Sequence, residues 1–235
     1  MKNILLKLFI LSATVSFIAC KQDSPVPPTP VSYSFSEGFD SLSVAYAKGW
    51  QSINRSSPLG PDTWASGALT YATSKGTVTT TYLFPPAAST NSGQDCIFVS
   101  PTSGGAGSAV SNWMFTPSTF MKNGDKFSFF VRTVANPATR ADRLQVRINA
   151  KDDNTVIDYT ATAVGDYTTM LLDINPTYAL SGVTAFPAVW TKYTVTLSGL
   201  VGLAKHRIAF RYVLPEIVNS GRGVGVDEVQ FTSAL

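Results

Sequence analysis

The chain has 235 residues, of which 44% are hydrophobic and 14% charged, and its formal net charge is +3. The first 19 residues hold two of the 18 basic residues and no acid, so 16 basic residues face 15 acidic ones in the remainder, a balance of +1. A nearly neutral domain offers no electrostatic case for nucleic-acid binding, which needs a clustered basic surface, and we expect no nucleic-acid partner.

The N-terminus has the features of a secretory signal. Lys2 and Lys7 flank or enter an apolar run at residues 4–19, which is short for a membrane span but suits the apolar part of a signal peptide. The run ends in Phe17-Ile18-Ala19-Cys20, which resembles the lipobox of bacterial lipoproteins, with Phe17 where leucine is usual. The resemblance implies cleavage before Cys20 and lipid attachment to it. The alternative, an uncleaved signal anchor, would need about 20 apolar residues.

A proline-rich stretch follows the expected cleavage point. It contains Pro25, Pro27, Pro28 and Pro30, which favour an extended conformation and cannot form a core. We therefore expect a signal peptide at 1–19, a lipidated tether at 20–31 and a folded domain at 32–235. The expected location is the bacterial cell envelope, at the outer membrane, with the lipid anchor as the domain's only membrane contact.

The rest of the chain has the pattern of an all-β fold. Apolar residues alternate with polar ones in short runs that are separated by Gly, Pro, Asn and Asp, which predicts half-buried strands and turns. The clearest alternating runs are 144–148, 193–197 and 208–212, and the expected loops are 100–108 and 215–223. The run 127–134 has apolar residues on both faces at its start, which is typical of a central strand of a sandwich. About 200 residues suffice for one well-buried sandwich. Cys96 is expected to be a small buried hydrophobe, because lipidation of Cys20 leaves it no disulfide partner.

The last predicted strand changes its parity. Val224 and Val226 set one alternation, whereas Val229 and Phe231 set the other. Either a β-bulge shifts the register near Asp227, or both faces of the strand are covered. If the second parity faces inward, the Asp227 carboxylate points toward the core and requires a cation or several hydrogen-bond donors.

Several segments together resemble the choice-of-anchor J, or cleaved-adhesin, domains of bacterial surface proteins. The matching segments are Phe35-Ser36-Glu37-Gly38-Phe39-Asp40, Gly49-Trp50, Trp64, Asn112-Trp113-Met114-Phe115-Thr116-Pro117, Trp190, Ile208-Ala209-Phe210-Arg211-Tyr212 and Val226-Asp227-Glu228-Val229. Asn112, Thr116 and Glu228 depart from the family's residues. The resemblance implies a jelly-roll β-sandwich of two antiparallel sheets.

The same resemblance implies a structural calcium ion bound by Glu37, Asp40 and Asp227. Carboxylate oxygens are hard donors of the kind that calcium prefers, with carbonyls and water completing its shell. The alternative is that these acids are ordinary turn and edge residues that accept hydrogen bonds from backbone amides.

The sequence favours a binding module over an enzyme, with no catalytic residues. His206, the only histidine, is expected in a solvated loop instead of an active site. A glycosidase needs two facing carboxylates, and the chain has only three glutamates. The Gly-x-Ser-x-Gly motif of serine hydrolases does not occur in the sequence. Trp50, Trp64, Trp113 and Trp190 are expected to pack in the core, whereas Tyr46, Tyr82 and Tyr178 are freer to meet a ligand.

The expected function is adhesion or carbohydrate binding, with a glycan or a surface protein as the ligand. The alternatives are an accessory glycan-active hydrolase and a structural subunit of a surface protein complex.

Overall fold

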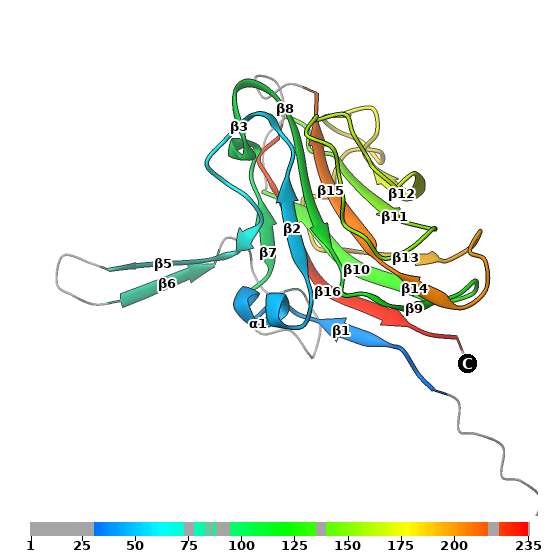
Figure 1. Ribbon diagram of the computed structural model, residues 1–235. Helices are drawn as coiled ribbons and strands as arrows, with labels where there is room; N and C mark the ends of the chain where they lie inside the picture. The colour runs from blue at the N-terminus through cyan, green and yellow to red at the C-terminus, as the bar shows by residue number, and fades with distance from the viewer. Residues whose placement is uncertain are drawn as a thin grey trace, which may run out of the picture. The chain divides into compact units, whose positions relative to one another are not determined.

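The computed structural model is a sandwich of two antiparallel β-sheets (Figure 1). It describes residues 31–72, 78–82, 84, 87, 95–134, 140–215 and 221–234. Met1–Pro30 and Val31–Leu235 separate as two compact units, and the predicted signal peptide, Cys20 and the tether through residue 30 lie outside the described residues. In the part of the chain that is described, no helix is both long and apolar enough to cross a membrane.

The first large sheet has the strand order β13-β10-β16-β7-β4, and β1 also pairs with β16. Its strands are β1 (Phe35–Glu37), β4 (Ala65–Ser66), β7 (Ile97–Val99), β10 (Lys126–Thr133), β13 (Thr191–Thr196) and β16 (Val224–Thr232). The prediction that 127–134 is a central strand is confirmed, because β10 lies between β13 and β16.

The second large sheet has the order β12-β11-β15-β8-β2, and β3 pairs with β8. Its strands are β2 (Gln51–Asn54), β3 (Ser57–Leu59), β8 (Gly104–Phe115), β11 (Leu144–Ile148), β12 (Thr169–Ile174) and β15 (Ile208–Leu214). The strands predicted at 144–148 and 208–212 are therefore confirmed.

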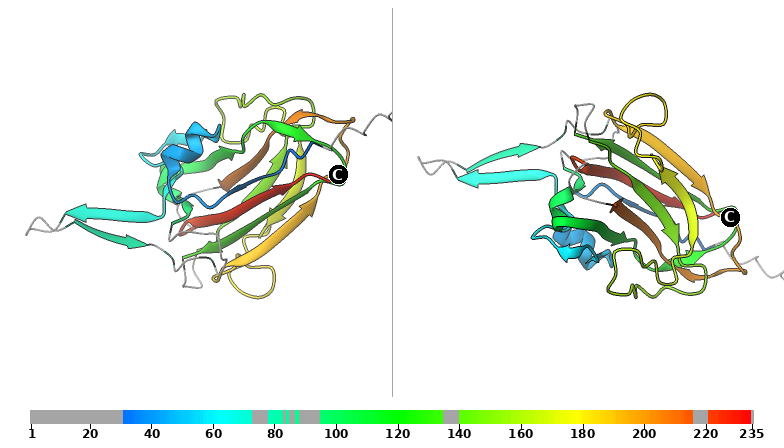
Figure 2. Two further views of the ribbon diagram at one scale, coloured as in Figure 1. Left: turned by 90° about the horizontal axis from the view of Figure 1, so that it is seen from below. Right: turned by 90° about the horizontal axis from the view of Figure 1, so that it is seen from above.

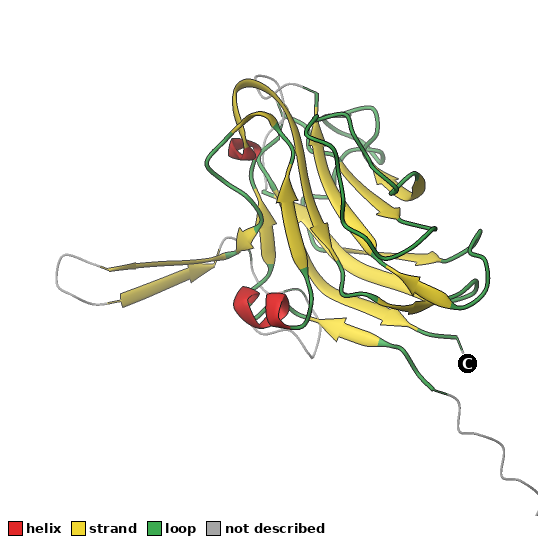
Figure 3. Cartoon of the chain, viewed as in Figure 1, coloured by secondary structure: helices red, strands yellow, loops and turns green. Residues whose placement is uncertain are grey.

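Short elements complete the described structure, in which strands predominate (Figure 3). They are the helix α1 (Leu42–Ala47), the 3-10 turn η1 (Pro101–Ser103), the pair β9 (Thr119–Met121) and β14 (Ala204–His206), and the hairpin β5 (Ala68–Ala72) and β6 (Val78–Tyr82). Views from below and above show this hairpin standing apart from the two large sheets (Figure 2).

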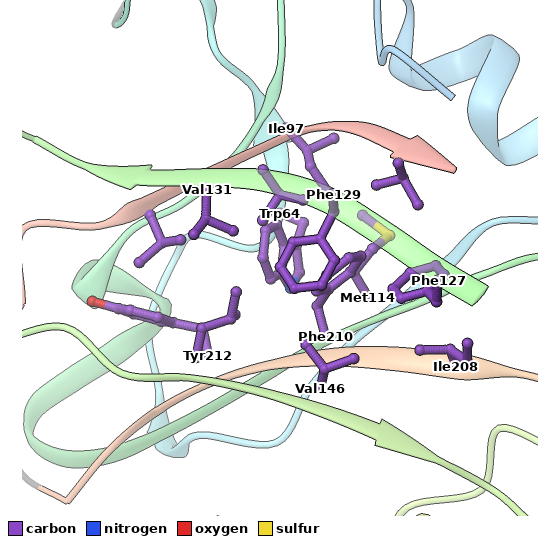
Figure 4. Close-up of a cluster of buried hydrophobic side chains, with 14 of the residues drawn as sticks. Trp64, Ile97, Met114, Phe127, Phe129, Val131, Val146, Ile208, Phe210 and Tyr212 are labelled. Carbon is purple, nitrogen blue, oxygen red and sulfur yellow. The ribbon is translucent and has the colours of Figure 1, made fainter. Parts of the chain in front are cut away.

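The core lies between the inward faces of the two sheets (Figure 4). Phe127, Phe129 and Val131 alternate along β10 and point toward the second sheet, where the Phe210 ring lies 5.0 Å from that of Phe129 in an edge-to-face contact. This arrangement follows directly from the period-two pattern, because alternate side chains of a strand share one face. Cys96 is buried and unpaired, as predicted.

The predicted loop at 100–108 is wrong for most of its length. β8 begins at Gly104 and continues to Phe115, and its first half pairs with β3. Small residues are needed there because the chain is crowded: a Cβ on Gly104 would collide with the side chain of Ser108. Gly104 and Gly105 therefore serve close packing within a strand, whereas Gly107, with φ of 69° and nothing within 4 Å of an added Cβ, serves the backbone conformation.

The change of parity in β16 is a β-bulge, the first of the two alternatives. Ser128 pairs with Gln230 and Phe130 with Asp227, so two steps along β10 match three along β16. The extra residue, Glu228, has a left-handed backbone with φ of 50°. The bulge lets residues of both parities face the core. Asp227 itself points away from the core. Paired residues lie on the same face of a sheet, and its partner Phe130 is on the face of β10 that points away from the core.

Candidate functional site

Asp227 is a buried carboxylate on the outer face of the first sheet. Its side chain is 0% exposed, although it lies outside the core. Its Oδ1 accepts a 2.7 Å hydrogen bond from the Glu228 N–H, whereas its Oδ2 and the buried Glu228 Oε1 have no hydrogen-bond partner in the structure. Burial raises the pKa of Asp227 to about 8; the Glu228 N–H opposes the shift, and the charges of Glu228, Asp40 and Asp95 add to it.

Glu37 is oriented toward other partners. It pairs with Val229, whose side chain belongs to the core, so Glu37 and Asp227 lie on opposite faces of the sheet. Glu37 Oε1 accepts a 3.0 Å hydrogen bond from the Phe39 N–H, and Oε2 forms a 2.9 Å ion pair with Lys48 Nζ.

The residues predicted as calcium ligands are thus brought together only in part. Asp40 lies close enough to act on Asp227 through its charge. Among the residues that the structure describes, no group of three His, Cys, Asp or Glu side chains is arranged to hold a metal ion. The feature that fits a cation is the pair of buried, unpartnered oxygens on Asp227 and Glu228, because such oxygens are costly without a donor or a metal. The calcium site stays a prediction.

The tryptophans do not form an open binding platform. Trp50, Trp64 and Trp113 are no more than 2% exposed, so their predicted packing is confirmed. Trp113 is stacked on Phe115, with ring centroids 5.9 Å apart, in a second apolar cluster on the outer face of the second sheet. Trp190 is half-buried, and its ring lies against Phe84.

The freer tyrosines are also engaged where their side chains are described. The Tyr178 hydroxyl donates to the carbonyl of Val213, and the Tyr46 hydroxyl lies 3.1 Å from the Ser52 hydroxyl. The side chain of Tyr82 is not among those that the structure describes.

The outer face of the second sheet is closed by the segment that precedes β12. Arg211 lies 5.0 Å above the Trp113 ring, and it donates to Ser111 Oγ, Gln145 Oε1 and the carbonyl of Ala161 in that segment. Burial, together with the charges of the neighbouring Arg147 and Arg143, lowers the pKa of Arg211 to about 10. These contacts leave the Trp113 ring buried instead of open to a ligand.

The expectation of a solvated His206 is wrong. The side chain is buried because β14 pairs with β9 and the turn at Asn149 lies against the ring. Nδ1 is 3.0 Å from the Asn149 carbonyl oxygen, which can only accept, so Nδ1 carries the proton and donates. The sequence missed this burial because His206 precedes the predicted strand, and the short pairing with β9 left no periodic signal.

Two adjoining cavities lie at one end of the sandwich, where β10 ends and β11 and β16 begin. The smaller has a volume of about 140 Å³ and is lined by Thr133, Val134, Arg140, Ala141, Asp142, Ala179, Leu180, Ala185, Phe186, Ala188 and Arg222. The larger, of about 580 Å³, is lined by Ser100, Pro101, Thr102, Val134, Arg140, Gly221 and Arg222. We call the pair the end cavity. Its size is within the range of small-ligand sites.

Asp142 forms part of the wall of the end cavity. Its buried carboxylate accepts hydrogen bonds from the hydroxyls of Thr133 and Tyr212 and from the backbone N–H groups of Arg222 and Gly223. Burial raises the pKa of Asp142, and these four donors oppose the shift. The sequence offered a weak signal for this site, the Gly221-Arg222-Gly223 run within the predicted loop at 215–223.

No protein-family model and no curated protein sequence matches the chain. It is similar to the solved K1 cleaved adhesin domain of Lys-gingipain from Porphyromonas gingivalis, with a TM-score of 0.52 and 20% identity over 86% of this chain and 99% of that domain. The K3 cleaved adhesin domain of the same protein gives a TM-score of 0.50 and 16% identity over 87% of this chain and 99% of that domain. The likeness shows an adhesin-like fold and confirms the predicted jelly-roll sandwich.

Proposed function

We propose that the domain is a non-catalytic binding module of the bacterial cell envelope that acts in adhesion or in glycan capture. The observation that carries the proposal is the end cavity, which combines two exposed arginines with an apolar stretch of wall at one end of the sandwich. Two structurally similar domains, both named as cleaved adhesin domains, support the same interpretation. Loops at the end of a rigid sandwich are a common place for binding residues.

The proposed location is the outer membrane, with the domain held there by lipid on Cys20. The segment Phe17-Ile18-Ala19-Cys20 and the proline-rich stretch that follows it support this placement. Two or three acyl chains on one cysteine would anchor the protein far better than a single chain.

We further propose a structural calcium ion beside the bulge of β16. The unpartnered oxygens of Asp227 and Glu228 would be its ligands, and the charge of Asp40 would add to the attraction. The ion would supply the positive charge that a buried carboxylate lacks, and would stabilise the bulge instead of taking part in a reaction.

The test is a binding screen with the full-length protein in detergent micelles, against arrayed glycans and envelope or host surface proteins. Saturable binding without product release is the expected result. Release of sugar products would instead identify an accessory hydrolase, and constant co-purification with one protein would identify a structural subunit. A protein that binds neither glycans nor proteins would refute the proposed function.

A further inference from the structure

Arg222 is held in place by a turn that depends on two glycines. Gly221 has φ of 73°, and a Cβ there would collide with the Tyr212 hydroxyl and lie 2.8 Å from Asp142 Oδ1. Gly223 has φ of 102°, and a Cβ there would collide with the Phe98 ring and lie 2.6 Å from the Val99 carbonyl oxygen. Both positions require glycine for conformation and for space.

A buried carboxylate completes this turn. Asp142 Oδ1 accepts from the Arg222 N–H at 3.0 Å, from the Gly223 N–H at 3.1 Å and from the Tyr212 hydroxyl at 2.6 Å. These contacts fix the backbone of Arg222 while its side chain stays exposed. The turn therefore presents one guanidinium group from a rigid base.

Arg140 supplies a second exposed guanidinium to the same place. Both arginines line both parts of the end cavity. Within the described residues, neither side chain has an acceptor or an ion-pair partner, whereas Arg143 pairs with Asp173 at 2.6 Å. The carboxylate that lines the cavity, Asp142, already accepts from four groups. Among the described residues, the rim thus offers donors and positive charge that no carboxylate receives.

One stretch of the cavity wall next to this rim is apolar. Leu180, Ala185 and Phe186 line the smaller part, and Phe186 is well buried. A guanidinium group binds a carboxylate through two parallel hydrogen bonds, and an apolar wall suits the C–H face of a sugar ring. The small, concave volume favours one compact residue over a protein partner, since protein interfaces bury about 800 Å² per partner.

We propose that Arg140 and Arg222 bind the carboxylate of an acidic sugar residue, which enters the end cavity with its ring against the apolar wall. This inference rests on the proposed binding function and names its ligand class. Arg222 makes the main contact from its rigid turn, and Arg140 makes the second. Neutral sugars lack the group that both guanidinium groups require.

The test uses full-length protein in detergent micelles and two pairs of probes: oligogalacturonate with its methyl ester, and a sialylated oligosaccharide with its desialylated form. We expect at least one acidic probe to bind and its neutral counterpart to bind roughly tenfold or more weakly, since charge-assisted hydrogen bonds are lost. Arg222→Gln and Arg140→Gln should each weaken acidic-probe binding by a similar factor. Lys126→Gln is the matched control, because it removes the same charge from the far end of β10.

Melting curves of the three variants establish that each is folded. The proposal is overturned if no acidic probe binds, if the neutral forms bind as well, or if the Arg variants bind like Lys126→Gln. An acidic peptide that binds in place of the sugars, and loses affinity in the Arg variants, would also overturn it and assign the rim to a protein partner. The proposed function has a separate failure, namely a folded protein that binds nothing in the wider screen.

Discussion

Substituting Gly221 by alanine should destabilise the protein through a specific collision. The left-handed backbone costs a non-glycine residue about 1–2 kcal/mol. The new Cβ would also displace the Tyr212 hydroxyl from Asp142, and a hydrogen bond to a charged group contributes about 1.5–3 kcal/mol. Alanine recovers about 0.4–1 kcal/mol by restricting the unfolded chain. The net loss should be roughly 2–4 kcal/mol, or about 5–15 °C in Tm for a domain of this size.

Gly202→Ala provides the control. Gly202 has nearly the same backbone, with φ of 70°, but nothing lies within 4 Å of an added Cβ. Its loss should be about 1 kcal/mol or less, from backbone strain alone. Chemical and thermal unfolding of both variants, repeated in a Tyr212→Phe background, measures the coupling. The reasoning is refuted if the two glycine variants lose equal stability, or if removing the Tyr212 hydroxyl leaves the cost of Gly221→Ala unchanged.

Three further predictions concern the cation, the thiol and the anchor. Calcium should stabilise the protein by about 2.7 kcal/mol at a hundredfold excess over its Kd, and Asp227→Asn should abolish the gain; identical melting curves in chelator and in calcium would exclude the site. Reductant should not change the Tm, because the Cys96 thiol is buried and unpaired; a drop of several degrees would reveal a disulfide. Cys20→Ser should prevent lipid attachment, and unchanged partitioning into detergent with unchanged cleavage would contradict the lipoprotein prediction.

The sequence predicted the strands well because their pattern is local. The apolar residues of 127–134 were enough to predict a central strand, and the parity change before Val229 left two alternatives, of which the pairing with β10 shows the bulge. The face on which Asp227 lies depends on its pairing with Phe130, nearly a hundred positions away in the chain, and no local pattern contains that pairing.

The end cavity could not be predicted for the same reason. Asp142 and Arg222 are 80 positions apart, and their contact depends on how β11 and β16 are placed in different sheets. A glycine on either side of an arginine is compatible with any surface turn. The crowding at both glycines and the hydrogen bonds from the Arg222 and Gly223 N–H groups to Asp142 show that this turn is held in place.

The pairing of β1 with β16 determines how the domain would bear mechanical load. β1 is antiparallel to β16, with Phe35 opposite Phe231 and Glu37 opposite Val229 (Figure 1). If the domain is tethered ahead of β1 and holds a ligand through Arg222, as proposed, the tether would pull past the C-terminal end of β16 and the ligand would pull on its N-terminal end. Tension between that anchor and the ligand would load the two strands in shear, and their hydrogen bonds would resist together instead of opening one at a time. The Phe35–Phe231 ring stack, with centroids 5.6 Å apart, lies on this line of force.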